Sequence, residues 1–419
     1  MKRLAICAGI LLGACTQSSQ SNSPEADATG DLHKRLLVLD SHLDTPALFH
    51  DATYTFSKRG SWEQDHTQVD LPRMEEGGLD GGFWVIYQPQ GPLIADSYAA
   101  AFTDAILRQS AIREFAAKYS NDVELAFTAE DAERIGRSGK KVVFQSMENA
   151  YPLGENVALL RTFYAGGLRM VAPVHYLNNQ FADAATDITP KHGGLSPLGE
   201  DLVREANRLG MVIDGSHASA ETIRDMMAIS STPIILSHSG AGGVYDHPRN
   251  APDDLIVDLA KDGGVVQVLA FSTYLQAPNP SPERAAAVAA LEAEYGASFG
   301  PSFYTLAPEK QDEFRAAMAE IGRKYPEPRA DFDKFMEHLL HVLDLVGPDH
   351  VGIGADWDGG GGVEGMDDVS QLPRVTQALL DAGYSEEDLA KIWGGNMLRV
   401  LREAEAARTV ALSSPGTMN

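Results

Sequence analysis

Short apolar runs alternate with longer amphipathic stretches along the chain from residue 33 onward. Short apolar runs bounded by turn residues are typical of buried strands, and longer amphipathic stretches are typical of helices. The alternation therefore predicts repeated β-α units that build a parallel sheet covered by helices. The expected strands are LLVLD (36–40), FWVIY (83–87), VVFQS (142–146), RMVAPV (169–174), MVID (211–214), PIILS (233–237), VVQVLA (265–270) and VGIGA (351–355).

These eight runs match the strand number of a TIM-type (β/α)8 barrel, so we expect an α/β fold of that type. Helices are expected between the runs, among them 95–119, 154–166, 197–209, 219–229 and 253–262. The longest interval, 272–349, has no further strand pattern but carries helix patterns at 283–295, 308–323 and 331–346. We interpret it as a helical insertion between the seventh and eighth strands, lying over or beside the open face of the barrel.

The N-terminus carries a targeting pattern: a basic start, a short apolar segment and the sequence Leu12-Gly13-Ala14-Cys15. The apolar segment is too short to span a bilayer and is typical of a secretory signal. A cysteine at the cut site resembles the bacterial lipobox, which predicts that 1–15 is a lipoprotein signal and that Cys15 is lipidated. The alternative is an ordinary signal peptide with an incidental cysteine. A flexible tether (16–30), one barrel domain (31–408) and a frayed tail (409–419) would follow.

Composition limits the partners of this chain. The sequence holds 34 basic and 59 acidic residues, for a net charge of −25. Binding to nucleic acid or anionic lipid needs clustered Lys and Arg, so we expect no nucleic acid partner and membrane contact through the anchor only. Apart from Cys15, the sequence has one cysteine, Cys7, which lies inside the signal, so the mature chain would have no disulfide.

Side chains that bind metals follow several of the expected strands. His42 and Asp44 follow the first strand, Glu148 follows the third, and His217 and His238 follow the fifth and sixth. Strand ends converge at one face of a parallel barrel, and imidazole and carboxylate groups are suitable zinc ligands. We therefore expect His42, Asp44 and Glu148 to hold one ion, and Glu148, His217 and His238 to hold a second.

Glu148 would then bridge two zinc ions that also share one hydroxide. An alternative for Glu148 is a carboxylate bound to a helix N-terminus. An alternative for a histidine at a strand end is an ordinary hydrogen-bonded residue.

Three further residues are candidates for substrate binding and catalysis. His175 could donate a hydrogen bond to an oxyanion, although a core histidine is the alternative. Arg249 could bind a substrate carboxylate, or form a structural ion pair with Asp246, Asp253 or Asp254. Asp356 lies closer than Asp358 to the end of the eighth strand, and we choose Asp356 as the proton shuttle on that ground.

Several segments in chain order resemble the membrane dipeptidase (renal dipeptidase) family of zinc peptidases, within the amidohydrolase superfamily. The segments are HLDTP, QVDLPRMEEGGLDGGFW, the strand that ends at Glu148, GLSPLGEDLVREANRLGMVIDGSHAS, PIILSHS, DHPRNAPDD, VGIGADWDG and GGNMLRVL. The resemblance implies the metal ligands given above, contact of His175 with the scissile carbonyl, and contact of Arg249 with the terminal carboxylate. It also implies proton transfer by Asp356 and a homodimer.

The sequence is thus interpreted as a binuclear zinc dipeptidase that cleaves L-Xaa-L/D-Xaa substrates by attack of metal-bound hydroxide. We expect it on the periplasmic face of a bacterial cell envelope, held by its lipid. One alternative is an amidohydrolase-type enzyme that acts on other amides or esters. A second is a non-catalytic lipoprotein that binds peptides.

Overall fold

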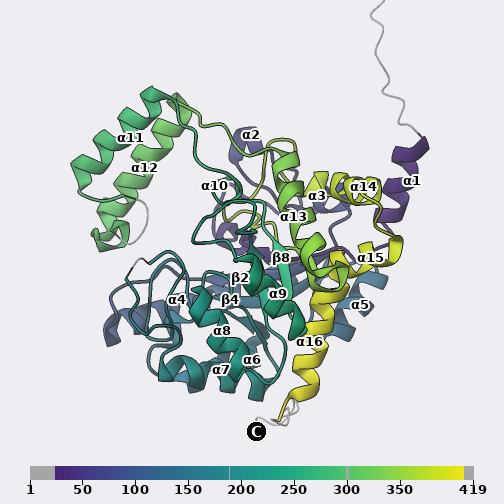
Figure 1. Ribbon diagram of the computed structural model, residues 1–419, viewed down its shortest axis with the longest axis horizontal. Helices are drawn as coiled ribbons and strands as arrows, with labels where there is room; N and C mark the ends of the chain where they lie inside the picture. Colours follow the sequence, from purple (N-terminus) through teal and green to yellow (C-terminus); the bar gives the residue numbers. More distant parts are fainter. Residues whose placement is uncertain (1–23, 188, 299–301, 410–419) are drawn as a thin grey trace, which may run out of the picture.

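The computed structural model describes residues 24–187, 189–298 and 302–409 of the chain (Figure 1). The signal sequence, Cys15 and most of the predicted tail lie outside these residues. Among the described residues, no helix is long and apolar enough to cross a bilayer.

The first described helix, α1 (Pro24–His33), overlaps the range predicted to be a tether. That prediction is wrong for 24–30, because α1 packs against α14 (Pro373–Asp381) instead of extending away from the domain. A contact between segments this far apart in sequence leaves no signal in local composition.

The eight expected strands form a barrel of parallel strands, which confirms the predicted fold. Their hydrogen-bonded order is β1-β2-β4-β5-β6 in one sheet and β7-β8-β9 in a second. Parallel bridges from Asp214 to Ile235 and from Leu43 to Trp357 join the two sheets and close the barrel. The strands are β1 (Leu39–Leu43), β2 (Gly81–Tyr87), β4 (Lys141–Glu148), β5 (Leu168–Val171), β6 (Val212–Ile213), β7 (Ile235–Ser239), β8 (Val265–Val268) and β9 (Val351–Ile353).

A ninth short strand, β3 (Val123–Leu125), was not expected from the sequence. It pairs with the first residues of β4, beyond the part of β4 that β5 reaches. Only Val123 of the three is buried, so β3 lacks the apolar run that identifies the barrel strands.

Helices follow the strands and cover the barrel (Figure 1). Helix α7 (Pro197–Leu209) has the predicted bounds. The Ser196 hydroxyl caps it by accepting from Gly199 N, and Pro197 occupies the first helical position. The other helices that follow strands or link the smaller elements are α2 (Trp62–Asp65), α3 (Leu71–Glu76), α4 (Ala95–Lys118), α5 (Ala129–Arg137), α6 (Leu160–Gly166), α8 (Ala220–Ile229), α9 (Asp253–Lys261), α10 (Ser272–Leu275), α15 (Glu386–Ala390) and α16 (Asn396–Ala407).

The insertion between β8 and β9 is a helical hairpin, smaller than the predicted range of 272–349. Helices α11 (Pro282–Tyr295) and α12 (Pro308–Lys324) project from the barrel (Figure 1) and share a separate apolar cluster formed by Leu291, Phe303 and Phe314. The third predicted helix, α13 (Phe332–Val346), instead packs on α9, β8 and β9. Its buried residues belong to the main core, so α13 is the barrel helix between β8 and β9.

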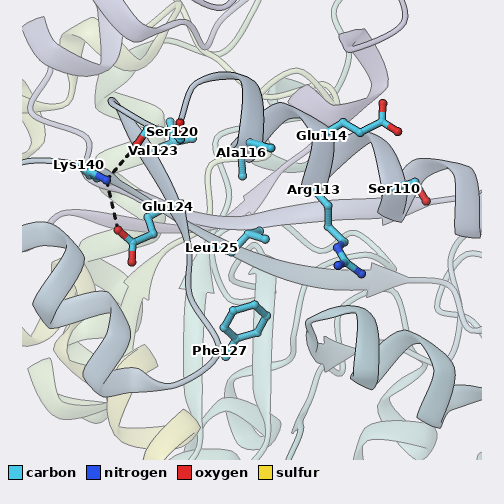
Figure 2. A pocket seen from close by; sticks show the side chains of 11 residues that line it. Ser110, Arg113, Glu114, Ala116, Ser120, Val123, Glu124, Leu125, Phe127 and Lys140 are labelled. Atoms are coloured by element: carbon cyan, nitrogen blue, oxygen red, sulfur yellow. Dashed lines mark hydrogen bonds and ion pairs between the residues drawn. The ribbon is translucent and has the colours of Figure 1, made fainter. Parts of the chain in front are cut away.

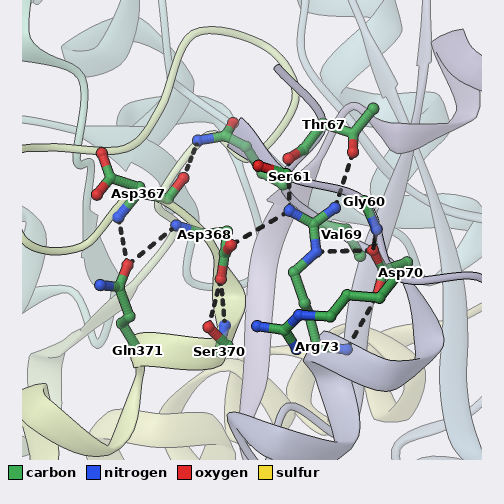
Figure 3. A network of polar contacts seen from close by, with 12 residues as sticks. Gly60, Ser61, Thr67, Val69, Asp70, Arg73, Asp367, Asp368, Ser370 and Gln371 are labelled. Carbon is green, nitrogen blue, oxygen red and sulfur yellow. Dashed lines mark hydrogen bonds and ion pairs between the residues drawn. The ribbon is translucent and has the colours of Figure 1, made fainter. Parts of the chain in front are cut away.

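A buried ionic network ties α3 to the segment before α14 (Figure 3). Arg73 is fully buried, and its Nε lies 2.7 Å from Asp70 Oδ2 while its Nη1 lies 3.2 Å from Asp368 Oδ2. The remaining guanidinium donors bind Thr67, through its carbonyl at 2.6 Å and its hydroxyl at 2.8 Å. Every charge in this network has a partner, which is how a buried ionic group remains compatible with a stable fold.

Candidate active site

The five predicted metal ligands converge at the carboxyl ends of the barrel strands. His42 lies in β1 with Asp44 directly after it, Glu148 is the last residue of β4, and His238 lies in β7. His217 follows β6, and its backbone adopts a positive φ of 68°. Left-handed backbone is unfavourable for residues other than glycine, and it occurs often at functional sites.

Glu148 lies at the centre of the cluster. Its Oε1 atom is 3.0 Å from His217 Nε2, 3.4 Å from His238 Nε2 and 3.7 Å from His42 Nε2. Asp44 approaches from the other side, with Oδ2 3.6 Å from His42 Nε2. Each of three overlapping sets offers ligand atoms within 4.8 Å of one another: His42, Glu148 and His238; Glu148, His175 and His217; His42, Asp44 and Asp356.

Several histidine nitrogens in the cluster have no hydrogen-bond partner in the described part of the chain. Neither ring nitrogen of His42 has a hydrogen-bond partner among the described residues, and the same is true of His217 Nδ1. The Nε2 atoms of His217 and His238 face each other at 2.9 Å. Buried polar atoms are normally satisfied, so this cluster has the donor set of a metal centre rather than of a packed core.

A short polar chain that the sequence reasoning missed orients His238. Ser237 Oγ lies 2.6 Å from Asp214 Oδ2 and 2.8 Å from His238 Nδ1. When Ser237 donates to Asp214, His238 Nδ1–H donates to Ser237, which leaves the Nε2 lone pair facing Glu148. In the sequence, Asp214 could be noticed only because it ends an expected strand. Other residues that do not touch the site also end strands, so this position alone does not identify it.

His175 lies beside the cluster rather than in an apolar core. Its Nε2 is 3.8 Å from Glu148 Oε1, and its Nδ1 is 3.3 Å from the hydroxyl of Tyr87. Burial, reinforced by the positive charge of Arg249, lowers the pKa of His175 well below its usual value. A neutral imidazole that faces the central carboxylate can donate or accept one hydrogen bond there.

Arg249 is buried beside the cluster and has no carboxylate partner among the described residues. Its Nη2 donates to the carbonyl of His238 at 2.6 Å, and its Nη1 donates to Ser239 Oγ at 3.0 Å. Its Nε has no hydrogen-bond partner within the described ranges. The expected alternative, an ion pair with Asp246, Asp253 or Asp254, is not formed, and a buried cation without an anion is suited to an anionic ligand.

The two aspartates after β9 face different surroundings. Asp356 Oδ1 lies 3.9 Å from His42 Nε2, on the side of the metal ligands. Asp358 instead accepts from Thr45 Oγ1 and from the backbone of Gln68, both at 2.7 Å. Both residues have positive φ, and burial raises the pKa of each to about 7. The geometry therefore brings Asp356, and not Asp358, into the cluster.

The charges of the cluster shift the pKa values of its members. Burial raises the pKa of Glu148 to about 8, and the nearby carboxylates of Asp44 and Asp356 act in the same direction. Burial opposes protonation of His42, but the surrounding carboxylates outweigh this effect and raise its pKa. So many buried acidic groups would repel one another without cations between them.

A pocket of about 300 Å³ opens onto the metal ligands, with Asp44, Glu148 and His175 in its wall. A larger hollow of about 820 Å³ lies elsewhere, along α4 and β3 (Figure 2). Lys140 in that hollow is bound to Glu124 and to the carbonyl of Ser120, and none of the metal ligands lines it. The smaller pocket, which has metal ligands in its wall, is therefore the candidate active site.

Comparisons with known proteins show the family to which this chain belongs. The model of the membrane dipeptidase family (peptidase family M19) matches residues 26–414. The dipeptidase tcpJ of Claviceps purpurea is 34% identical over 355 residues, which cover 84% of this chain and 72% of that protein.

Solved structures show the same relationship. The probable dipeptidase PvdM from Pseudomonas aeruginosa is 31% identical with a TM-score of 0.81, over 92% of this chain and 100% of that one. A metallo peptidase from Rhodobacter sphaeroides, solved with a phosphinate mimic of the dipeptide L-Ala-D-Ala, is 23% identical with a TM-score of 0.69. That match covers 88% of this chain and 99% of that one, and it shows a shared fold.

Proposed function

We propose, from the premise that this chain belongs to the membrane dipeptidase family, that it is a binuclear zinc enzyme that hydrolyses dipeptides. Membership makes it a metal-dependent dipeptidase in class; the two ions, the bridge and the residue roles are the proposal. The observation that carries it is the convergence of five metal-binding side chains in one cluster, in which several histidine nitrogens have no hydrogen-bond partner among the described residues.

The residues fit two zinc ions. His42, Asp44 and Glu148 would hold one ion, and Glu148, His217 and His238 would hold the other. When bound, the ions would supply a water of lowered pKa and polarise the scissile carbonyl. The relay from Asp214 through Ser237 would keep His238 in the tautomer that binds metal.

The other residues bind and orient the peptide. Arg249 would hold the terminal carboxylate with its fork of donors, and this contact places the scissile carbonyl above the ligand cluster. His175 would hydrogen-bond the carbonyl oxygen as negative charge develops on it. Asp356 would take the proton that water releases and deliver it to the amide nitrogen, so that the C–N bond breaks to give a free amine and a carboxylate.

A substrate panel measured with metal content tests this function. The purified protein should hold two zinc ions per chain and hydrolyse L,L and L,D dipeptides faster than tripeptides, because Arg249 requires the carboxylate one residue from the scissile bond. Arg249→Met should raise KM for dipeptides while the zinc content stays at two. Full zinc loading with no turnover of any dipeptide would reject the proposal.

The alternative of a hydrolase for other amides or esters makes a different prediction. Such an enzyme would act on C-terminally amidated dipeptides as well as on free acids, and Arg249→Met would leave its activity unchanged. We favour the dipeptidase because Arg249 is a buried cation without an anionic partner among the described residues.

We also propose attachment to the periplasmic face of a bacterial envelope through a lipid on Cys15, supported by the lipobox-like sequence. Cells expressing the full chain should incorporate labelled palmitate into it, and Cys15→Ser should abolish the label and release the protein from membranes.

A homodimer is a further proposal from the family resemblance. Light scattering of the mature domain at twice the monomer mass would support it, and a monomer would reject it.

A further inference from the structure

Arg108 is a second arginine near the cluster, and the function proposed above does not use it. It lies in α4, far in sequence from every metal ligand, and its side chain lines the same pocket as Asp44, Glu148 and His175. Its Nη1 donates to the carbonyl of Pro46, in the turn that directly follows Asp44. This bond fixes the guanidinium at the wall of the pocket.

The guanidinium of Arg108 is half-buried and forms no ion pair with a described residue. Burial lowers its pKa, and Asp44 and Asp104 attract it only from beyond ion-pair distance. An arginine stays charged even so, and its bond to Pro46 occupies one of five donors. The pocket thus has a cation in its wall with donors left for an anion.

Arg108 and Arg249 approach the metal ligands from different sides. Arg249 contacts His238 and Ser239 of β7, and it lines a separate hollow together with His217. Arg108 shares its pocket with Asp44, next to β1. A dipeptide whose terminal carboxylate is held at Arg249 and whose carbonyl lies at Glu148 would therefore place its N-terminal residue on the side of Arg108.

We propose that Arg108 is a specificity residue that binds an acidic side chain on the N-terminal residue of the substrate. The preferred class is then dipeptides that begin with glutamate or aspartate. This inference rests on the proposed dipeptidase function and adds the substrate class to it. The physical basis is a charge-assisted, bidentate contact between guanidinium and carboxylate in a partly desolvated pocket.

Pairs of isosteric substrates test the inference. The unmodified protein should have a kcat/KM for Glu-Ala about tenfold higher than for Gln-Ala, as expected for one hydrogen-bonded charge pair. This ratio should fall as salt is added, because the contact is partly exposed. The ratio for Ala-Glu over Ala-Gln should stay near one, since that side chain would lie on the side of Arg249.

Variants separate recognition from support of the turn at Pro46. Arg108→Gln should bring the Glu-Ala to Gln-Ala ratio near one, and Arg108→Lys should restore part of it. Arg108→Glu should invert the preference toward Lys-Ala, which a purely structural role cannot do. Arg113→Gln is the matched control: Arg113 lies on the same helix but lines the hollow of Figure 2, so this variant should keep the ratio of the unmodified protein.

Two outcomes would overturn the inference: hydrolysis of neutral dipeptides without any preference for Glu-Ala, or a preference that survives in Arg108→Gln. A preference in the Ala-Glu pair would overturn the assignment to the N-terminal residue. If no dipeptide is hydrolysed at all, the proposed function itself has failed and the inference fails with it.

Discussion

Two regions of this molecule bury charged groups in opposite ways. In the network around Arg73, the cation contacts Asp70 and Asp368, and its other donors bind Thr67 (Figure 3). At the strand ends, Glu148 lies close to several histidines and carboxylates. Among the residues that the structure describes, three histidine nitrogens there have no hydrogen-bond partner and Arg249 donates only to neutral acceptors. In the first region, the charges are paired within the folded protein. The second region has the unpaired polar groups expected of a site that binds ligands.

The difference shows how to read buried polar groups. A buried charge with all its partners contributes to a defined fold, and removing one partner is costly. A buried charge without partners costs free energy in the folded chain, and its presence is explained by a ligand that balances it. The strained backbone at His217 and Asp356 occurs in the second region, where function rather than stability sets the geometry.

The largest effect should come from Glu148→Gln. Gln keeps the shape but lacks the charge to bridge two ions, so kcat/KM should fall by roughly three orders of magnitude or more. Without metal, Glu148→Gln should melt at nearly the same temperature as the unmodified protein, because Gln keeps the shape of the side chain and removes one of several buried carboxylates that repel one another. Zinc content and thermal melting of both proteins check this, and full activity with two zinc ions would contradict the comparison.

Matched substitutions of the two buried arginines should separate the regions by stability. Arg73→Met leaves the buried Asp70 and the partly buried Asp368 without a cation, so the free energy of unfolding should fall by about 3–5 kcal/mol. Arg249→Met removes a cation that forms no ion pair with a described residue, so it should change the free energy of unfolding by less than about 1 kcal/mol. Urea denaturation of the metal-free proteins measures both, and equal losses would mean that Arg249 is structural.

Asp356 and Asp358, which both follow β9, allow the same comparison between two neighbouring buried carboxylates. Asp356→Asn should lower kcat by about 100-fold with zinc retained, because a group that transfers a proton is lost. Asp358→Asn should have a far smaller effect, since its bonds to Thr45 and Gln68 mark it as part of the scaffold. Steady-state kinetics with metal analysis checks this, and the reverse order of effects would assign the shuttle to Asp358.

The smallest expected effect is a pH dependence of stability from His33, on the structural side of the comparison. His33 is fully buried and contacts Thr376 at 2.6 Å and the Gly77 carbonyl at 2.9 Å, and burial lowers its pKa from 6.5 to about 4. The unfolded chain binds more protons between these values, so the stabilising effect is present above pH 6.5 and is lost as pH falls toward 4.

Between pH 7 and pH 5 this loss should be about 2 kcal/mol. Urea denaturation across that pH range should show that the free energy of unfolding falls more steeply with decreasing pH for the unmodified protein than for His33→Gln. Parallel declines would contradict the assignment. Because the difference between the two proteins is measured, other buried acids such as Asp80 affect both equally.

Much of the fold could be predicted because burial on both faces leaves a local signal. The runs at 142–146 and 265–270 are mostly apolar and buried along their whole length, and each became a barrel strand. β3 escaped prediction because three residues at the edge of β4 bury one side chain. α13 was assigned to the insertion because its amphipathic pattern does not say which surface its apolar face meets.

The sequence by itself determined which residues end the strands, and so which side chains could meet: His42, Glu148 and His238 follow from that rule alone, because parallel strands share one carboxyl edge. Tertiary structure decided the partners. Only contacts between distant segments show that Arg73 also meets Asp368, that Arg249 forms no ion pair with a described residue, and that Arg108 reaches the pocket from the middle of a helix. The reason is physical: periodicity encodes which face of an element is buried, whereas charge balance depends on what the folded chain brings within a few ångströms.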